Sequence, residues 1–201
     1  MKKITLALLI LCWLFPVQFF SQNKVTEKTD NYCSGIDSLI ANDLNLHVAF
    51  MVHSIDLETN KRAIGRQYTT VKFFYPMPLD SVIESEKETE FIYVYKPPFK
   101  INVEYNIAAS QKNVIDYYFN EKGKLILYKY LSKGEYGCIG LTKYFDKNKL
   151  IKDANLKLSD CIEDNAMTMQ QNSVTEVKIL DNAKAYLKMF NKLVRFEQLD
   201  K

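Results

Sequence analysis

The sequence predicts an α+β fold, in which an antiparallel β-meander sheet packs against a short N-terminal helix and a long C-terminal helix. Three observations lead to this prediction. Apolar and polar residues alternate through the middle of the chain, a polar turn between an aromatic and an aliphatic strand occurs twice, and residues 174–196 place apolar side chains at helical spacing. About 180 residues follow the predicted leader, enough for one domain with a sizeable core.

The first 22 residues have the pattern of a secretory signal peptide. Two lysines precede an apolar run from Ile4 to Phe20, and a polar chain follows. We place cleavage near Ser21 or Gln22, which predicts a periplasmic or extracellular protein with residues 23–201 as its domain and no stable membrane span. Because the apolar run approaches the roughly 20 residues that cross a bilayer, an uncleaved membrane anchor is the alternative.

Local patterns predict the elements of this domain between its two ends. Residues 34–45 have apolar side chains at helical spacing behind Ser34, which would cap a short helix. The charged segment 79–90 is expected to be a connection or a single helical turn. Strands are expected between about 47 and 155, in the segments 46–56, 66–76, 91–96, 101–109, 114–119, 124–131, 140–145 and 149–154.

One motif, YYFNEKGKLILY at residues 117–128, is echoed by KYFDKNKLIK at residues 143–152. In the first copy, Asn120 suits the first position of a type I turn and Gly123 suits the left-handed position that closes a bulged hairpin. The second loop is one residue shorter, so that Asn148 must carry any positive φ. We therefore expect two hairpins with different turn types.

The segment SVTEVKILDNAKAYLKMFNKLVRF predicts the C-terminal helix. Ser173 and Glu176 have the spacing of a capping box. The expected apolar stripe consists of Val177, Leu180, Ala183, Leu187, Phe190 and Val194. Such a stripe needs a partner surface, and the apolar face of the sheet is the obvious one.

Residues 91–196, with the YYFNEKGKLI hairpin and its echo KYFDKNKLI, resemble a group of uncharacterised exported bacterial proteins. Members of that group share a YYF-[ND]-x-x-G-K-L-I hairpin, a second hairpin and a terminal amphipathic helix. The resemblance implies a fold and an export route, and no activity. A looser similarity exists to the hairpin repeats of antitoxin-type and YD-type proteins, but those have many copies at a short period.

Composition and motifs disfavour several classes of function. Two of the 27 basic residues lie in the leader, so 25 basic and 24 acidic residues remain, interleaved and without a nucleic-acid-binding stripe. No nucleophile elbow, phosphate-binding glycine loop or dinucleotide fingerprint occurs. His47 and His53 would lie about 20 Å apart on a regular strand, too far to share a metal. We therefore expect no cofactor, no metal site and no catalytic residue, and an envelope enzyme is the alternative to a non-enzymatic protein.

The mature chain keeps three cysteines, Cys33, Cys138 and Cys161. An exported protein lies where disulfides persist, so we expect one bond and one free thiol. Three pairings remain open. We prefer Cys33 with Cys161, because both lie in polar, loop-like contexts, whereas Cys138 lies in a strand-like one.

The chain is rich in aromatic residues, with 13 Tyr and 12 Phe, and this is the compositional feature with functional potential. We expect a non-enzymatic binding protein whose partner, a protein, peptide or glycan, contacts the sheet face that the C-terminal helix leaves uncovered. An envelope hydrolase and a structural or assembly accessory are the alternatives. The candidate binding residues are Tyr93, Tyr95, Tyr118, Tyr128 and Tyr130.

Overall fold

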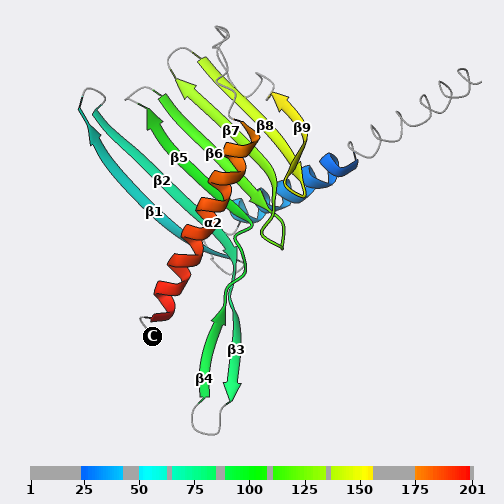
Figure 1. The fold of residues 1–201 in the computed structure, drawn as a ribbon, viewed down its shortest axis with the longest axis vertical. Helices are drawn as coiled ribbons and strands as arrows, with labels where there is room; N and C mark the ends of the chain where they lie inside the picture. The colour runs from blue at the N-terminus through cyan, green and yellow to red at the C-terminus, as the bar shows by residue number, and fades with distance from the viewer. Residues whose placement is uncertain are drawn as a thin grey trace, which may run out of the picture.

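The computed structural model describes residues 24–42, 50–62, 65–84, 89–107, 111–134, 137–155 and 175–199. Seven strands form one antiparallel sheet in the order β1-β2-β5-β6-β7-β8-β9, which confirms the predicted α+β meander (Figure 1). Their bounds are β1 Phe50–Lys61, β2 Gly65–Pro76, β5 Lys100–Ile107, β6 Gln111–Phe119, β7 Leu125–Gly134, β8 Gly137–Asp146 and β9 Lys149–Asn155.

Two helices cover opposite faces of this sheet (Figure 1). Helix α2, Glu176–Leu199, crosses one face diagonally and packs on the larger core cluster, while the N-terminal helix, residues 24–42, packs on a smaller cluster of the other face. The predicted helix over 34–45 therefore begins at least ten residues earlier than expected. Within the described ranges, no helix has the length and apolar character needed to cross a membrane.

The buried stripe of α2 differs in part from the predicted one. Ala183, Phe190 and Val194 are buried as expected, and Ile179 joins them. Val177, however, is 68% exposed and was wrongly assigned to the stripe. Positions 179, 183, 190 and 194 are separated by three- and four-residue steps or their sums, so they share one face of the helix. Residue 177 is two residues before position 179, a spacing that places its side chain on another side of the helix. Ser173 of the predicted capping box lies outside the described residues.

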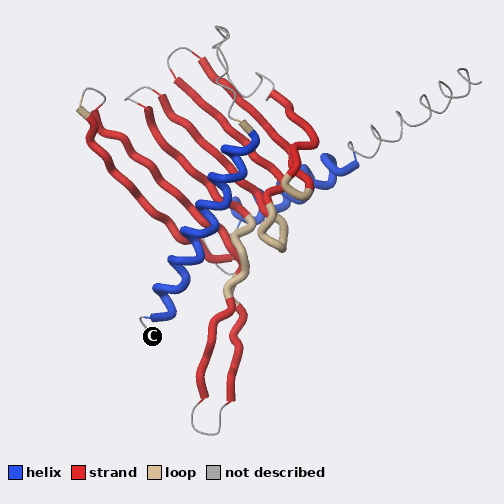
Figure 2. The backbone as a smooth tube through the Cα atoms, in the orientation of Figure 1, coloured by secondary structure: helices blue, strands red, loops and turns tan. Residues whose placement is uncertain are grey.

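The segment 79–90 does not form the expected connection. Strands β3, Leu79–Glu84, and β4, Thr89–Val94, pair with each other as a separate antiparallel ribbon. Figure 2 shows this ribbon projecting from the domain beyond the loops that join it to the sheet. Pro76 and Pro78 precede the ribbon and Pro97 and Pro98 follow it. Because proline cannot donate to a central ladder, these residues separate the ribbon from the main sheet.

The two copies of the echoed motif form the hairpins β6–β7 and β8–β9, and their turns differ as predicted. Asn120 Oδ1 accepts hydrogen bonds from the backbone N–H groups of Lys122 and Lys124, both at 3.0 Å, and Gly123 has φ of 67°. In the second copy Lys147 and Asn148 have φ of 49° and 65°. Two successive left-handed residues are the pattern of a type I′ turn, so a lysine shares the role that was expected of asparagine alone.

We expect Gly123→Ala to lower the free energy of unfolding by about 2 kcal/mol, since a side chain in the left-handed region costs about 1–2 kcal/mol. The added Cβ would also lie 3.2 Å from Pro97 Cβ. Gly65→Ala is the matched control, because Gly65 has φ of 84° but no atom within 4 Å of the added Cβ. Urea denaturation should show a smaller loss for Gly65→Ala, about 1 kcal/mol. Equal losses would contradict a role for the Pro97 contact.

Candidate functional site

The N-terminal helix is held on the sheet by two carboxylates. The hydroxyl of Tyr118 donates to both oxygens of Asp37 at 2.8 Å, and Lys100 Nζ donates to Asp37 Oδ1 at 2.7 Å. About two helical turns earlier, Asp30 accepts a hydrogen bond from the hydroxyl of Tyr144 at 2.8 Å. The helix thus presents acidic side chains at intervals that match tyrosines of β6 and β8.

Charged groups surround the ring of Tyr118 as well as its hydroxyl. Lys100 Nζ lies 4.8 Å from the ring centroid and Lys129 Nζ 5.2 Å from it, on the scale of cation–π contacts. Burial raises the pKa of Tyr118, and the nearby Asp116 and Asp37 raise it further. The phenol therefore stays neutral and remains a hydrogen-bond donor. The residues around Tyr118 thus bind one another and attach the N-terminal helix to the sheet.

The structure does not bring the five candidate tyrosines together on one exposed face. Tyr118 is buried beneath the N-terminal helix, whereas Tyr128 is buried in the core beneath α2. Tyr130 is half-buried and donates to Asn113 Oδ1 at 2.8 Å, and Tyr95 is half-buried with its ring 6.1 Å from that of Tyr75. The side chain of Tyr93 lies outside the described part of the chain. The sheet face that α2 leaves uncovered was expected to carry the aromatic platform, but the N-terminal helix packs on that face and buries Tyr118.

The cysteines also differ from the preferred pairing. Cys33 is buried against the sheet with a free thiol, so its predicted bond to Cys161 is wrong. The residue lies on the inner side of a helix, and the expectation failed because this helix extends back through a segment that was read as a loop. Burial raises the pKa of the Cys33 thiol to about 12, which keeps it protonated and unreactive. Cys161 lies outside the described residues.

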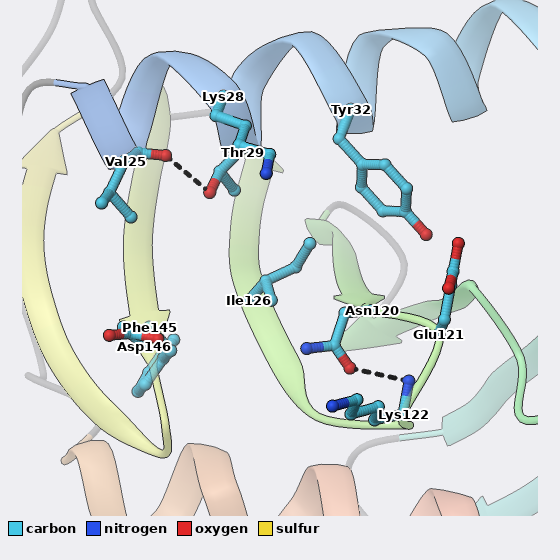
Figure 3. A pocket seen from close by; sticks show the side chains of 10 residues that line it. All are labelled: Val25, Lys28, Thr29, Tyr32, Asn120, Glu121, Lys122, Ile126, Phe145 and Asp146. Atoms are coloured by element: carbon cyan, nitrogen blue, oxygen red, sulfur yellow. Dashed lines mark hydrogen bonds between the residues drawn. The ribbon is translucent and has the colours of Figure 1, made fainter.

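A groove of about 510 Å³ lies between the N-terminal helix and the ends of the two echoed hairpins (Figure 3). The helix contributes Val25, Lys28, Thr29 and Tyr32. Opposite these residues lies the 120–122 segment of the first turn. The volume falls within the roughly 300–1,000 Å³ of ligand sites in proteins.

The floor of the groove is apolar and its opposite walls are tied together. Ile126 of β7 forms the floor, Phe145 at the end of β8 is itself buried in the core beneath α2, and Asp146 marks the start of the second turn. The hydroxyl of Tyr32 donates to the backbone carbonyl of Phe119 at 3.3 Å, which joins the helix to the end of β6. Burial, and after it the carboxylate of Glu121, raises the pKa of the Tyr32 phenol. One hydrogen bond thus joins the helix side of the groove to the sheet side.

The lining of the groove mixes polar, charged and apolar groups. Its lining offers hydroxyls, an amide, two amines and two carboxylates around apolar carbon. Among the described residues, no group of three or more His, Cys, Asp and Glu side chains is placed to hold a metal. His53 lies under α2, apart from the groove, and its Nε2 is 3.1 Å from the hydroxyl of Tyr75. His47 is outside the described residues.

Sequence reasoning did not find this groove. The echoed motif was the available signal, because both of its turns lie at one end of the sheet and contribute Asn120, Glu121, Lys122 and Asp146 to the lining. The missing information was that a helix begins by residue 24 and passes over that end. Comparison with known proteins adds no further guide, since no protein-family model, no curated protein and no solved structure matches the chain.

Proposed function

We propose that the protein is an exported, non-enzymatic binding protein whose recognition site is the groove between the N-terminal helix and the two echoed hairpin turns. The observation that carries the proposal is a preformed concave surface with an apolar floor and polar walls. Ligand sites have this composition, because apolar area supplies affinity and a few polar groups fix orientation. The proposal moves the interaction surface from the sheet face to one end of the sheet.

The geometry favours a binding role for a second reason. Tyr32, which is 38% exposed, presents part of its ring to the groove while its hydroxyl is held by the end of β6. Ordered aromatic side chains lose little conformational entropy on binding and are enriched at interfaces. With its hydroxyl bound to the end of β6, Tyr32 thus offers aromatic contact area on the same groove as Ile126.

A pull-down from envelope extract tests this proposal with a variant that fills the groove. Thr29→Trp places an indole between the helix and the turns, whereas Ser38→Trp adds the same side chain at an exposed position of the same helix. We expect partners of the wild-type protein to be lost from Thr29→Trp and retained by Ser38→Trp. Circular dichroism of both variants checks their folding. Retention of all partners by a folded Thr29→Trp protein would remove the groove from the proposal.

If the protein is exported, two of its three mature cysteines should form a disulfide bond. We expect Cys138 to pair with Cys161 in the oxidised protein, because Cys33 is free and Cys138 is not. Ellman's reagent should react with a single thiol after unfolding without reductant, and very slowly with the native protein, because Cys33 is buried with a raised pKa. A Cys33→Ser control should show no thiol signal after unfolding. Rapid reaction of the native protein, or a further thiol in the control, would contradict this assignment.

A further inference from the structure

We infer that the β3–β4 ribbon is a dimerisation arm, and that two copies of the chain associate with their ribbons side by side in antiparallel orientation. The inference goes beyond the proposed function and concerns another part of the molecule. It follows from the position of the ribbon, from its apolar residues and from the distribution of charge along it.

The ribbon stands away from the core that its apolar residues would need. Among the described residues its strands pair only with each other, and they project beyond the loops that join them to the domain (Figure 2). Because neighbouring residues of a strand lie on opposite faces, both faces of the ribbon include apolar positions. Val94 is 47% exposed. The apolar and aromatic residues of the two strands are Leu79, Val82, Ile83, Phe91, Ile92, Tyr93 and Val94.

A ribbon of two strands needs a further surface to be stable. An isolated hairpin is marginally stable in water, whereas three or more strands with an apolar face can be stable. The outer edges of such a ribbon also present backbone N–H and C=O groups to which another strand can bind. A second ribbon supplies both, because two ribbons side by side make four strands and pair one edge of each.

Charge complementarity favours a second copy of this chain as the partner. Residues 79–94 hold five carboxylates and one lysine, a net charge of −4. The chain without its predicted leader has 25 basic and 24 acidic residues, so the rest of the domain has 24 basic and 19 acidic residues, a net charge of +5. The acidic ribbon of one copy is therefore complementary to the basic remainder of another.

The acidic residues of the ribbon and the nearby lysines belong to opposite ends of it. At the base, Lys96 precedes Pro97, and a Cβ added at Gly123 would lie 3.2 Å from Pro97 Cβ. Lys122 and Lys124 flank Gly123, so three lysines surround this contact. The tip, residues 84–90, includes the outer ends of both strands. Four of the five carboxylates of the ribbon belong to the tip: Glu84, Glu86, Glu88 and Glu90.

The three lysines of the base are available to a partner. All three are exposed, and none of them takes part in the ion pairs found among the described residues. The carboxylates beside them in the chain or on the ribbon are Glu121 and Asp80, which leave the base positive. The tip has only Lys87 against its four carboxylates. Tip and base are thus complementary in charge.

Repulsion between the tips selects the antiparallel orientation. Six residues of strand span about 20 Å at roughly 3.3 Å per residue. In a parallel pair the two acidic tips would lie together, whereas in an antiparallel pair they are separated by more than the Debye length of about 8 Å at physiological ionic strength. Each tip then lies beside the base of the partner's ribbon. This arrangement has two-fold symmetry, so each contact occurs twice and the assembly closes as a dimer.

Charge reversal tests the inference, with the molar mass measured by light scattering during gel filtration. We expect the wild-type protein to form a dimer that weakens at high salt, because salt screens ion pairs at a protein surface. Glu84→Lys with Glu90→Lys reverses the tip, and Lys96→Glu with Lys124→Glu reverses the base. Either double variant alone should raise the dissociation constant of the dimer about a hundredfold, since both symmetric contacts become repulsive.

An equimolar mixture of the two double variants distinguishes this arrangement from a general effect of charge. The reversed tip of one variant is complementary to the reversed base of the other, and the unchanged tip and base form the second contact. We therefore expect the mixture to form a heterodimer at concentrations where each variant alone is monomeric. Lys178→Glu with Lys188→Glu, two exposed residues of α2, is the control and should dimerise as wild type. Circular dichroism checks that each variant is folded.

Several results would overturn the inference. A monomeric wild-type protein, a dimer that neither reversal weakens, or a mixture that stays monomeric would each contradict it. A monomeric wild-type protein that binds a labelled peptide of alternating lysine and leucine, and loses this binding when the tip is reversed, would replace the second copy by a basic partner. None of these results bears on the groove, because the reversed residues do not line it.

Discussion

Phe190→Ala is expected to lower the free energy of unfolding by about 3–5 kcal/mol, the usual loss for a buried phenylalanine. Phe190 is 1% exposed, and its ring centroid lies 4.9 Å from that of Tyr75 and 5.8 Å from that of Phe73. The substitution leaves a cavity where α2 crosses the first strands of the sheet. Urea denaturation followed by circular dichroism measures the loss.

Phe196→Ala is the matched control, since Phe196 lies on the same helix and is 66% exposed. Its substitution should change stability by less than about 0.5 kcal/mol. Similar losses for the two variants would contradict the packing of α2 on the sheet, because residues 190 and 196 lie on different sides of the helix and only Phe190 faces the core.

Asp37→Ala is expected to lower the free energy of unfolding by about 2–3 kcal/mol. The change removes the acceptor of the Tyr118 hydroxyl and one partner of Lys100, whose side chain is only 13% exposed. Loss of a buried pair costs about 3–5 kcal/mol, but the Asp37 side chain is 39% exposed and Asp116 stays 3.5 Å from Lys100, so the loss should be smaller. Urea denaturation gives the value.

A double-mutant cycle with Tyr118→Phe isolates the hydrogen bond between the two residues. We expect the losses to be non-additive by about 1 kcal/mol or more, because either substitution removes the same interaction. Asp181→Ala is the control for the carboxylate, since the pair of Asp181 with Lys184 is exposed and its loss should cost less than about 1 kcal/mol. Additive losses would mean that Asp37 does not hold the helix through Tyr118.

Both helices matter for the proposed site, but in different ways. The attachment of Asp37 to Tyr118, with that of Asp30 to Tyr144, positions the helix that forms one wall of the groove. We therefore expect Asp37→Ala to weaken groove binding as well as stability. The core beneath α2 supports the sheet whose hairpins form the other wall.

Much of the fold could be predicted because its signals are local. Residues close in sequence determine the alternation along β5 to β9, the Asn120 to Gly123 turn and the stripe of α2. Over such short stretches the period of a strand or a helix decides which side chains share a face. The β3–β4 ribbon was not predicted, because its strands are short and the charged residues of segment 79–90 are more typical of a connection. The prolines that bracket it were the signal of its separation.

By itself the sequence determined the meander, the two turn types, the C-terminal helix and the absence of known cofactor motifs. Only the tertiary structure decided which tyrosines are buried, and that the N-terminal helix lies beside the turns of the echoed motif. Tyr118 and Tyr128 have similar local contexts, yet each is buried by a different helix that lies more than 45 residues away in the chain. Burial and clefts depend on contacts between distant segments, which local periodicity does not encode. The motif YYFNEKGKLILY specifies a hairpin, and the helix that passes over its turn makes it one wall of a groove.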